Sequence, residues 1–206
     1  WSNLARKLAH EIKNPLTPIQ LSIDRINEKY TKQIDNNEKD NFEENLKIIN
    51  NQIKQIGNLV NEFSDFARMP KPILKKNDLI KIIKDNIKLL SEIDSSIKLN
   101  LISKKSVISL ESDKEQMNRV IFNLIKNSIE SIQQKAENTG NFNKIIDIEI
   151  YDKSNQIYII ITDNGLGFGN FTRNLNEILN PYVTTKKNGT GLGLSIVNKI
   201  INDHNG

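Results

Sequence analysis

The side chain best suited to act as a nucleophile is His10, in the run LAHEIKNPLTP at residues 8–18. At about 100° per residue, it falls about 200° from both Leu8 and Ile12 on a helical wheel. We therefore expect the imidazole to lie opposite the apolar stripe and to be exposed. Neutral imidazole is a competent nucleophile near pH 7. A lone helical histidine is more often a hydrogen-bonded structural residue, and this alternative stays open on His10 alone.

Three neighbours of His10 favour chemistry. Glu11 is the candidate base, because a carboxylate can accept the second ring N–H, but adjacent helical residues point in different directions and Glu11 must bend around the helix. Its alternative is a solvated charge. Asn14 lies one turn further on the same face as His10. Pro15 lacks an N–H and clashes with the carbonyl of Glu11, which predicts a kink in the helix.

A second candidate site follows the apolar run IYIIIT at residues 157–162, which predicts a buried strand that ends at Asp163. A carboxylate at the end of a buried strand could accept a hydrogen bond from an adenine amino group. Gly165 and Gly167 permit a close approach that a Cβ would block. Taken alone, the sequence Asp-Asn-Gly is an ordinary turn.

A glycine-rich segment opens the last predicted helix, which starts near residue 191, and its N–H groups could bind a phosphate chain. A dinucleotide fold would need a strand directly before it and an acidic residue about 20 positions later, and a P-loop would need a lysine after the glycines. Neither pattern is present. The candidate phosphate-binding residues are Gly189, Thr190, Gly191, Leu192 and Gly193.

A helix predicted over residues 114–134 carries Asn123 and Asn127 on one face, with Lys126 and Glu130 close by. An amide oxygen can ligate Mg²⁺, which usually keeps water and substrate phosphates among its ligands. Asn127 is the candidate metal ligand. The alternative is a polar stripe on an amphipathic helix.

Periodicity organises these residues into two regions. Apolar positions at steps of three and four predict helices over residues 4–30 and 42–63, joined by a polar loop at 31–40. Two helices have no interior, so we expect a dimer that forms a four-helix bundle. Prolines at 70 and 72 end the second helix. Beyond them, helices at 79–90 and 114–134 and strands at 97–102, 107–110, 145–151 and 157–162 predict an α/β sandwich.

Composition sets broad limits. The chain has 206 residues, a net charge of +4 and no cysteine, which excludes disulfides and thiolate metal sites. Its basic residues are mixed with acids, so we expect no nucleic-acid partner. No apolar run reaches the length of a membrane span, and the N-terminus lacks a signal-peptide pattern. Because the chain begins at Trp1, without methionine, we take it to be a fragment.

Together, the four motifs resemble the sensor histidine kinases of two-component signalling. His10–Pro15 is similar to the H-box, Asn118–Asn127 to the N-box, Asp163–Gly167 to the first glycine box and Gly189–Gly193 to the second. The resemblance implies a dimerisation and histidine-phosphotransfer domain at residues 1–68, a linker at 69–77, and a catalytic domain at 78–206. The latter resembles the GHKL, or Bergerat-type, ATP-binding fold. Residues 9–22 and 63–72 are similar in particular to NtrY-type nitrogen-regulation sensors.

This resemblance implies the chemistry and the partners. His10 takes the γ-phosphoryl group of ATP and passes it to an aspartate on a response regulator, here of the NtrX type. Asp163 holds adenine, and Asn127 holds Mg²⁺. Asn123 stands where hydrolysing relatives carry a glutamate, which favours transfer over hydrolysis, and Asn14 could serve a phosphatase reaction. Further expected contacts are Lys126, and Thr185 and Lys186 in a mobile lid over ATP.

The chain departs from the resemblance in two respects, and two other functions stay open. The family fold normally continues with closing strands after a last helix, and we expect them to be missing from this chain, as are sensor and membrane segments. The chain would then be the cytoplasmic portion of an inner-membrane sensor kinase. The alternatives are a dimeric scaffold that binds nucleotide without phosphorylating itself, and an ATPase of the same superfamily.

Overall fold

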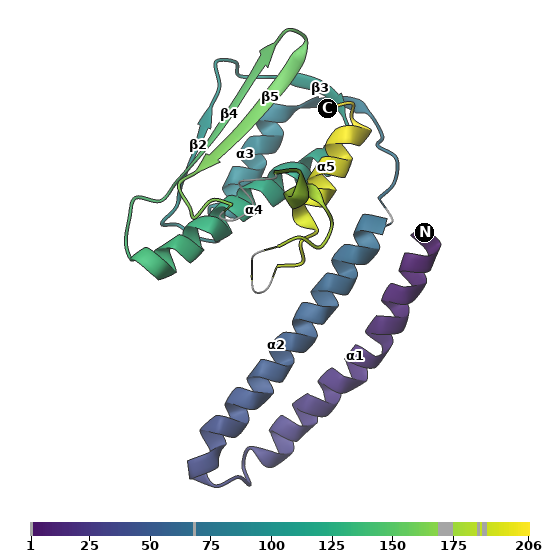
Figure 1. Cartoon of the computed structure of the whole chain (residues 1–206), viewed down its shortest axis with the longest axis vertical. Coiled ribbons are helices and arrows are strands. Elements are labelled where there is room, and N and C mark those ends of the chain that lie inside the picture. Colours follow the sequence, from purple (N-terminus) through teal and green to yellow (C-terminus); the bar gives the residue numbers. More distant parts are fainter. Residues whose placement is uncertain (1, 68, 169–174, 185, 187–188) are drawn as a thin grey trace. The chain divides into compact units, whose positions relative to one another are not determined.

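The computed structural model describes residues 2–67, 69–168, 175–184, 186 and 189–206. It forms two compact units: Trp1–Pro70 with Thr185–Leu192, and Lys71–Thr184 with Gly193–Gly206. Figure 1 labels the helices and strands of each unit. Among the described residues, no helix combines the length and the apolar content that spanning a membrane requires.

The first unit contains a helical hairpin of α1 (Ser2–Tyr30) and α2 (Asn36–Ala67). This confirms the predicted helical region, although α2 begins at Asn36, inside the segment expected to be a loop. Ala9 and Ile23 from α1 and Leu46 and Val60 from α2 are buried where the helices pack.

Much of the apolar surface of the hairpin is exposed. Small and aliphatic side chains fill the α1–α2 contact, but several larger apolar residues, most of them in the predicted stripes, are left exposed by the part of the chain that the structure describes. A single hairpin thus buries only part of its apolar surface. These exposed residues are Leu8, Ile12, Ile19, Leu21, Ile26, Tyr30, Ile48, Ile49, Ile56 and Leu59.

The second unit is an α/β domain, as predicted. Its three-stranded sheet has the order β2–β4–β5, in which β2 is parallel and β5 antiparallel to β4. Helices α3 and α4 pack on the sheet, and α5 packs beside α4 (Figure 1). The bounds are α3 (Leu79–Leu90), β2 (Lys98–Ile102), α4 (Lys114–Thr139), β4 (Ile145–Lys153), β5 (Gln156–Asp163), η2 (Leu175–Leu179) and α5 (Gly193–Asp203).

A short antiparallel pair of strands differs from the prediction. Strand β1 (Lys75–Asp78) begins in the segment expected to be a linker, and it pairs with β3 (Ser109–Ser112), which overlaps the strand predicted at 107–110 but is shifted by two residues. The sequence KKND of β1 lacks the apolar alternation by which a strand is identified. Its last residue, Asp78, also caps α3 by accepting a hydrogen bond from Ile80 N–H at 3.0 Å.

The core of the second unit lies between the sheet and α4. Ile146, Ile148 and Ile150 alternate along β4 and are almost fully buried. They are covered by a buried face of α4 that includes Ile125 and Ile132. Each such side chain contributes about 1.5–3 kcal/mol on burial. The sheet therefore fixes α4, the helix that carries the predicted asparagine motif.

A buried polar contact joins α3 to α4. The Asn86 side chain is only 5% exposed, and its amide donates to the Ile82 carbonyl at 2.8 Å and to Asn118 Oδ1 at 3.0 Å. The first bond lies within α3, and the second crosses to α4. Both hydrogens of the buried amide are thus satisfied.

Candidate functional site

His10 lies on the exposed surface of α1, as the helical wheel predicts. Glu11 and Asn14 are exposed as well. Glu11 faces back along the helix, where its carboxylate lies 3.9 Å from the Lys7 ammonium. Among the described residues, Glu11 thus pairs with Lys7 one turn before it, and it accepts no hydrogen bond from the imidazole.

Helix α1 continues through Pro15 and Pro18. Proline has no N–H, so the carbonyls of Glu11 and Asn14 lack the helical donor four residues further on. Two main-chain hydrogen bonds are therefore missing directly after His10. The kink predicted at this position stays a prediction.

In the second unit, α4 presents a polar series at four-residue intervals: Asn123, Asn127, Ser131 and Lys135. The first residue of α5, Gly193, lies next to Asn127, since a Cβ built on Gly193 would be 3.8 Å from Asn127 Nδ2. The structure thus brings a residue of the predicted asparagine motif and a residue of the second glycine motif into proximity. The described residues contain no group of three or more His, Cys, Asp or Glu suited to a metal.

As the sequence suggests, the Asn127 amide would supply only one of the oxygen ligands of Mg²⁺. A single amide oxygen leaves most ligand positions to phosphate and water, which is how Mg²⁺ is usually bound beside nucleotides. Lys126, the neighbour of Asn127, lies 3.8 Å from the Glu130 carboxylate, and 48% of its side chain is exposed. It can therefore exchange this ion pair for a phosphate at little cost.

Asp163 ends β5 on the face of the sheet that packs against the helices. It lies opposite Ile146 in the register, and its neighbours Ile161 and Ile159 share that face. The carboxylate is half-buried, and its Oδ1 accepts a hydrogen bond from Gly165 N–H at 2.9 Å. The turn after the strand thus orients the carboxylate.

The turn after Asp163 lies directly against Ser131 of α4. A Cβ built on Gly165 would come within 2.3 Å of Ser131 Oγ and 2.7 Å of the Ser131 carbonyl carbon. Leu166 N–H donates to Ser131 Oγ at 3.0 Å. Only glycine fits at position 165 without a shift of the helix backbone. Gly167 has φ +70°, in the region that glycine adopts most readily.

Asn164 ties the same turn to the start of β4. Its Oδ1 accepts from Ile145 N–H at 3.1 Å, and its Nδ2 donates to the Asn143 carbonyl at 2.6 Å. The Lys135 ammonium donates to the Asn164 backbone carbonyl at 2.6 Å and lies 4.7 Å from the centre of the Phe142 ring. The turn is therefore bonded to both α4 and β4.

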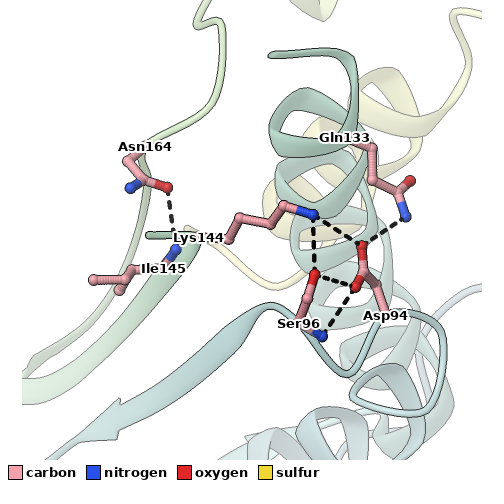
Figure 2. A network of polar contacts seen from close by, with 6 residues as sticks. All are labelled: Asp94, Ser96, Gln133, Lys144, Ile145 and Asn164. Carbon is pink, nitrogen blue, oxygen red and sulfur yellow. Dashed lines mark hydrogen bonds and ion pairs between the residues drawn. The ribbon is translucent and has the colours of Figure 1, made fainter. Parts of the chain in front are cut away.

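Figure 2 shows how the start of β4 is held in turn. The Lys144 ammonium donates to Ser96 Oγ at 2.9 Å and lies 3.9 Å from the Asp94 carboxylate, which also accepts from the Gln133 amide at 3.3 Å. The Ser96 hydroxyl, the largest influence, lowers the pKa of Asp94 below its ordinary value, with support from Ser96 N–H, Gln133 and Lys144 against the opposing effect of burial.

The second glycine segment is divided between the units. Gly189–Leu192 belongs to the first unit, where the Thr190 hydroxyl donates to the Glu62 carboxylate, and Gly193 belongs to the second. Gly191 has φ +68° and Leu192 is fully buried. Lys186 accepts a hydrogen bond from Gly189 N–H through its backbone carbonyl. Thr185 lies outside the described residues, as does much of the predicted lid.

A junction at the start of α4 was not predicted. The Asp113 carboxylate accepts from Gln116 N–H at 3.0 Å, which caps the helix, and from Ile73 N–H at 2.9 Å. The Asp113 N–H donates to His204 Nε2 at 3.0 Å. Burial raises the pKa of the Asp113 carboxyl, but the N–H groups of Ile73, Gln116 and Glu115 outweigh it, and the pKa falls below its ordinary value.

A separate hollow of about 390 Å³ lies between α3 and α4. Of the predicted nucleotide motifs only Asn118, the first residue of the asparagine motif, lines it, and it is open to solvent. We therefore do not place the nucleotide there. Its lining residues are Asp85, Asn86, Leu89, Asn118, Arg119 and Phe122.

Two family models match the chain, one for each motif region. Residues 1–72 match the His Kinase A (phospho-acceptor) domain. Residues 112–206 match the Histidine kinase-, DNA gyrase B-, and HSP90-like ATPase domain. His10 falls in the first match, and Asn127, Asp163 and Gly193 fall in the second.

Similar proteins include the NtrY-like sensor histidine kinase of Rickettsia prowazekii, which is 38% identical over 206 residues. Another is the nitrogen regulation protein NtrY of Azorhizobium caulinodans, which is 35% identical over 212 residues. Both alignments include the whole of this chain but only 33% and 26% of the relatives. The chain thus spans a third or less of these two proteins.

Solved structures show the same fold. Full-length ShkA in complex with AMPPNP has a TM-score of 0.70, with 15% identity, over 98% of this chain and 41% of that chain. The catalytic domain of ThkA has a TM-score of 0.54, with 26% identity, over 64% of this chain and 81% of that chain.

Proposed function

Because the chain belongs to the sensor histidine kinase family, we propose that it transfers the γ-phosphoryl group of ATP to His10 and from there to a response regulator. The observation that carries this proposal is an exposed histidine in one unit together with three residues of the other: Asp163 on the sheet face that packs against the helices, and Asn127 of α4 beside Gly193 of α5. In the first step, an imidazole nitrogen attacks the γ-phosphorus, the bond to the bridging oxygen breaks, and ADP leaves with the electron pair.

In this proposal residues 78–206 bind ATP. The Asp163 carboxylate accepts from the adenine amino group, and the N–H groups at the start of α5 face the phosphates. Bound Mg²⁺ would offset the phosphate charge, with the Asn127 amide as its protein ligand. Further proposed nucleotide contacts are Asn123, Lys126, Gly165, Gly167, Thr185, Lys186, Gly189, Thr190, Gly191 and Leu192.

Beside His10, we assign Glu11 the role of accepting the second ring N–H during attack. This requires its carboxylate to leave the Lys7 ion pair, which is solvent-exposed and therefore weak. The rotation moves only side-chain atoms. Asn14 is assigned to a second reaction, in which it orients water for the dephosphorylation of the regulator.

We propose that residues 1–68 form the phosphotransfer domain, 69–77 a connecting segment and 78–206 the ATP-binding domain, and that β1 joins the end of the connection to that domain. The exposed apolar surface of the hairpin supports a homodimer with a four-helix bundle. Sedimentation equilibrium of Ile56→Glu, compared with the exposed control Lys54→Glu, tests this. The dimer proposal predicts a monomer only for Ile56→Glu.

A regulator of the NtrX type is the proposed acceptor, and the whole protein is proposed to be an inner-membrane sensor with this chain in the cytoplasm. Both statements follow from the resemblance to NtrY-type sensors, which is supported by relatives that are 38% and 35% identical to this chain. Purified regulator should gain label from the phosphorylated kinase and lose it more slowly with Asn14→Ala. Fractionation of the full-length protein tests the location.

The central experiment uses the fact that the sequence contains two histidines, His10 and His204. The chain is incubated with γ-labelled ATP and Mg²⁺, and protein-bound label is tested for acid lability and alkali stability. We expect label in the wild type and in His204→Gln and none in His10→Gln. Equal labelling of all three proteins would exclude His10 as the acceptor.

The same assay separates the alternatives. A nucleotide-binding scaffold without kinase activity binds ATP but gains no label. An ATPase releases phosphate steadily without a labelled protein. The amide at Asn123 disfavours hydrolysis of ATP, because it cannot take a proton from water as a carboxylate does.

A further inference from the structure

We propose that Ser131 is a positioning residue for adenine recognition, because it holds the turn at residues 163–167 against α4. This inference rests on the proposed binding of ATP, in which Asp163 recognises the adenine amino group. It adds a residue that lies outside the four motifs. The preference for adenine over other nucleobases then depends on α4.

The orientation of the Asp163 carboxylate is set by the turn that follows it. Its Oδ1 is held by Gly165 N–H at 2.9 Å. The direction of the carboxylate therefore depends on where the Gly165 backbone lies. The other oxygen, Oδ2, has no hydrogen-bond partner in the part of the chain that the structure describes, and it is available to an amino group.

Gly165 is in turn held in position by Ser131. The space for a Cβ is occupied by Ser131 Oγ at 2.3 Å and by the Ser131 carbonyl carbon at 2.7 Å. The next N–H along the turn, that of Leu166, donates to Ser131 Oγ at 3.0 Å, and the Ser131 carbonyl lies 3.4 Å from the same nitrogen. One serine thus sets the distance of the turn from α4.

Ser131 lies on the same face of α4 as Asn127, the proposed metal ligand. Ser131 follows Asn127 by four residues, which is about 6 Å along the same face of a helix. Asn127 lies beside Gly193 at the start of α5. The proposed adenine contact and the proposed metal ligand are therefore both positioned by α4, whose buried face is fixed on the sheet.

Lys135 provides a matched control on the same helix. It also bonds the turn, but through an exposed hydrogen bond to the backbone carbonyl of Asn164. Loss of its ammonium leaves the Gly165–Ser131 contact and the Leu166 hydrogen bond in place. An exposed hydrogen bond of this kind contributes little in water.

The test measures dissociation constants of fluorescent ADP and GDP with the full chain and Mg²⁺. Guanine carries a carbonyl where adenine carries the amino group, so a correctly oriented carboxylate favours ADP. We expect Ser131→Ala to weaken ADP binding about 5- to 10-fold, equivalent to one hydrogen bond, and to leave GDP binding nearly unchanged. Ser131→Thr, which keeps the hydroxyl, and Lys135→Met should retain the wild-type preference.

The outcomes separate this role from the proposed function. If the wild type does not prefer ADP over GDP, the adenine contact of Asp163 fails and this inference fails with it. If the wild type prefers ADP and Ser131→Ala keeps that preference, only the role of Ser131 is wrong. Equal weakening of ADP and GDP by Ser131→Ala would indicate a general structural effect and would also overturn it.

A second measurement is independent of nucleotide. The Leu166 amide should exchange its hydrogen faster in Ser131→Ala than in the wild type or in Lys135→Met, because its nearer acceptor, Ser131 Oγ at 3.0 Å, is removed and only the carbonyl at 3.4 Å remains. Unchanged exchange at Leu166 would contradict the proposed contact even where the variant folds normally.

Discussion

Replacement of Asp113 by alanine removes two hydrogen bonds from the junction at the start of α4. The carboxylate caps the helix through Gln116 N–H and holds the segment before β1 through Ile73 N–H. Loss of a helix cap costs about 1 kcal/mol, and loss of one further hydrogen bond costs about 0.5–1.5 kcal/mol. We expect the free energy of unfolding of the second unit to fall by about 2 kcal/mol.

Amide hydrogen exchange, resolved by peptide, reports this loss for the second unit separately from the hairpin. A destabilisation of about 2 kcal/mol raises the exchange rate of the slowest α4 amides about 30-fold where exchange requires unfolding of the unit. The control Glu111→Ala removes an exposed carboxylate two residues earlier on β3 and should change stability by less than about 0.5 kcal/mol.

The effect of Asp113 should also depend on pH. The pKa of its carboxyl is lowered in the folded protein, so its stabilising contribution is complete above the unfolded pKa of about 3.9 and is lost as the pH falls through the folded value. Thermal unfolding of the wild type and of Asp113→Ala should therefore differ at pH 7 and converge in strong acid. Equal stability of Asp113→Ala and Glu111→Ala at pH 7 would refute this reasoning.

Three further predictions concern the second unit. Gly165→Ala should cost about 1–3 kcal/mol in unfolding free energy through overpacking and should weaken ADP binding, as measured by urea unfolding and fluorescent nucleotide titration. Ile125→Ala should cost about 2–5 kcal/mol in urea unfolding because Ile125 is fully buried, whereas the half-exposed Ile102→Ala should cost far less. Ser96→Ala should raise the pKa of Asp94 toward its ordinary value in an NMR titration, since the Ser96 hydroxyl is the main cause of the lowering, and an unchanged pKa would contradict this.

Periodicity was sufficient to predict most of the elements. The isoleucines of β4 and α4 repeat with the periods of a strand and a helix, and both elements are present where the pattern placed them. The pattern failed for β1, which is polar and is defined by its partner β3 and not by its own sequence. A short exposed strand carries little local signal.

The exposure of His10 could also be predicted, because it depends only on the apolar stripe of its own helix. The ion pair of Glu11 could not, since either Lys7 or the imidazole is within reach of a flexible side chain. Which partner it takes depends on rotamer and solvation, and these are not encoded by spacing.

The contacts that hold the nucleotide motifs were harder to predict. Ser131 continues the four-residue series from Asn123 and Asn127, so spacing could have drawn attention to it. The bond between Asp113 and His204 joins residues 91 positions apart and leaves no local pattern. Such contacts arise from tertiary packing, which a single sequence without aligned relatives does not display.

The buried amide of Asn86 has a consequence for motion in the second unit. Its hydrogens are satisfied only when α3 and α4 keep their present register. Sliding α3 by one turn would leave a buried donor unpaired, at a cost of about 1–3 kcal/mol. A purely apolar contact would resist such a shift less specifically. The two helices are therefore expected to translate as one piece, and a displacement of α3 is passed directly to the helix that carries Asn127 and Ser131.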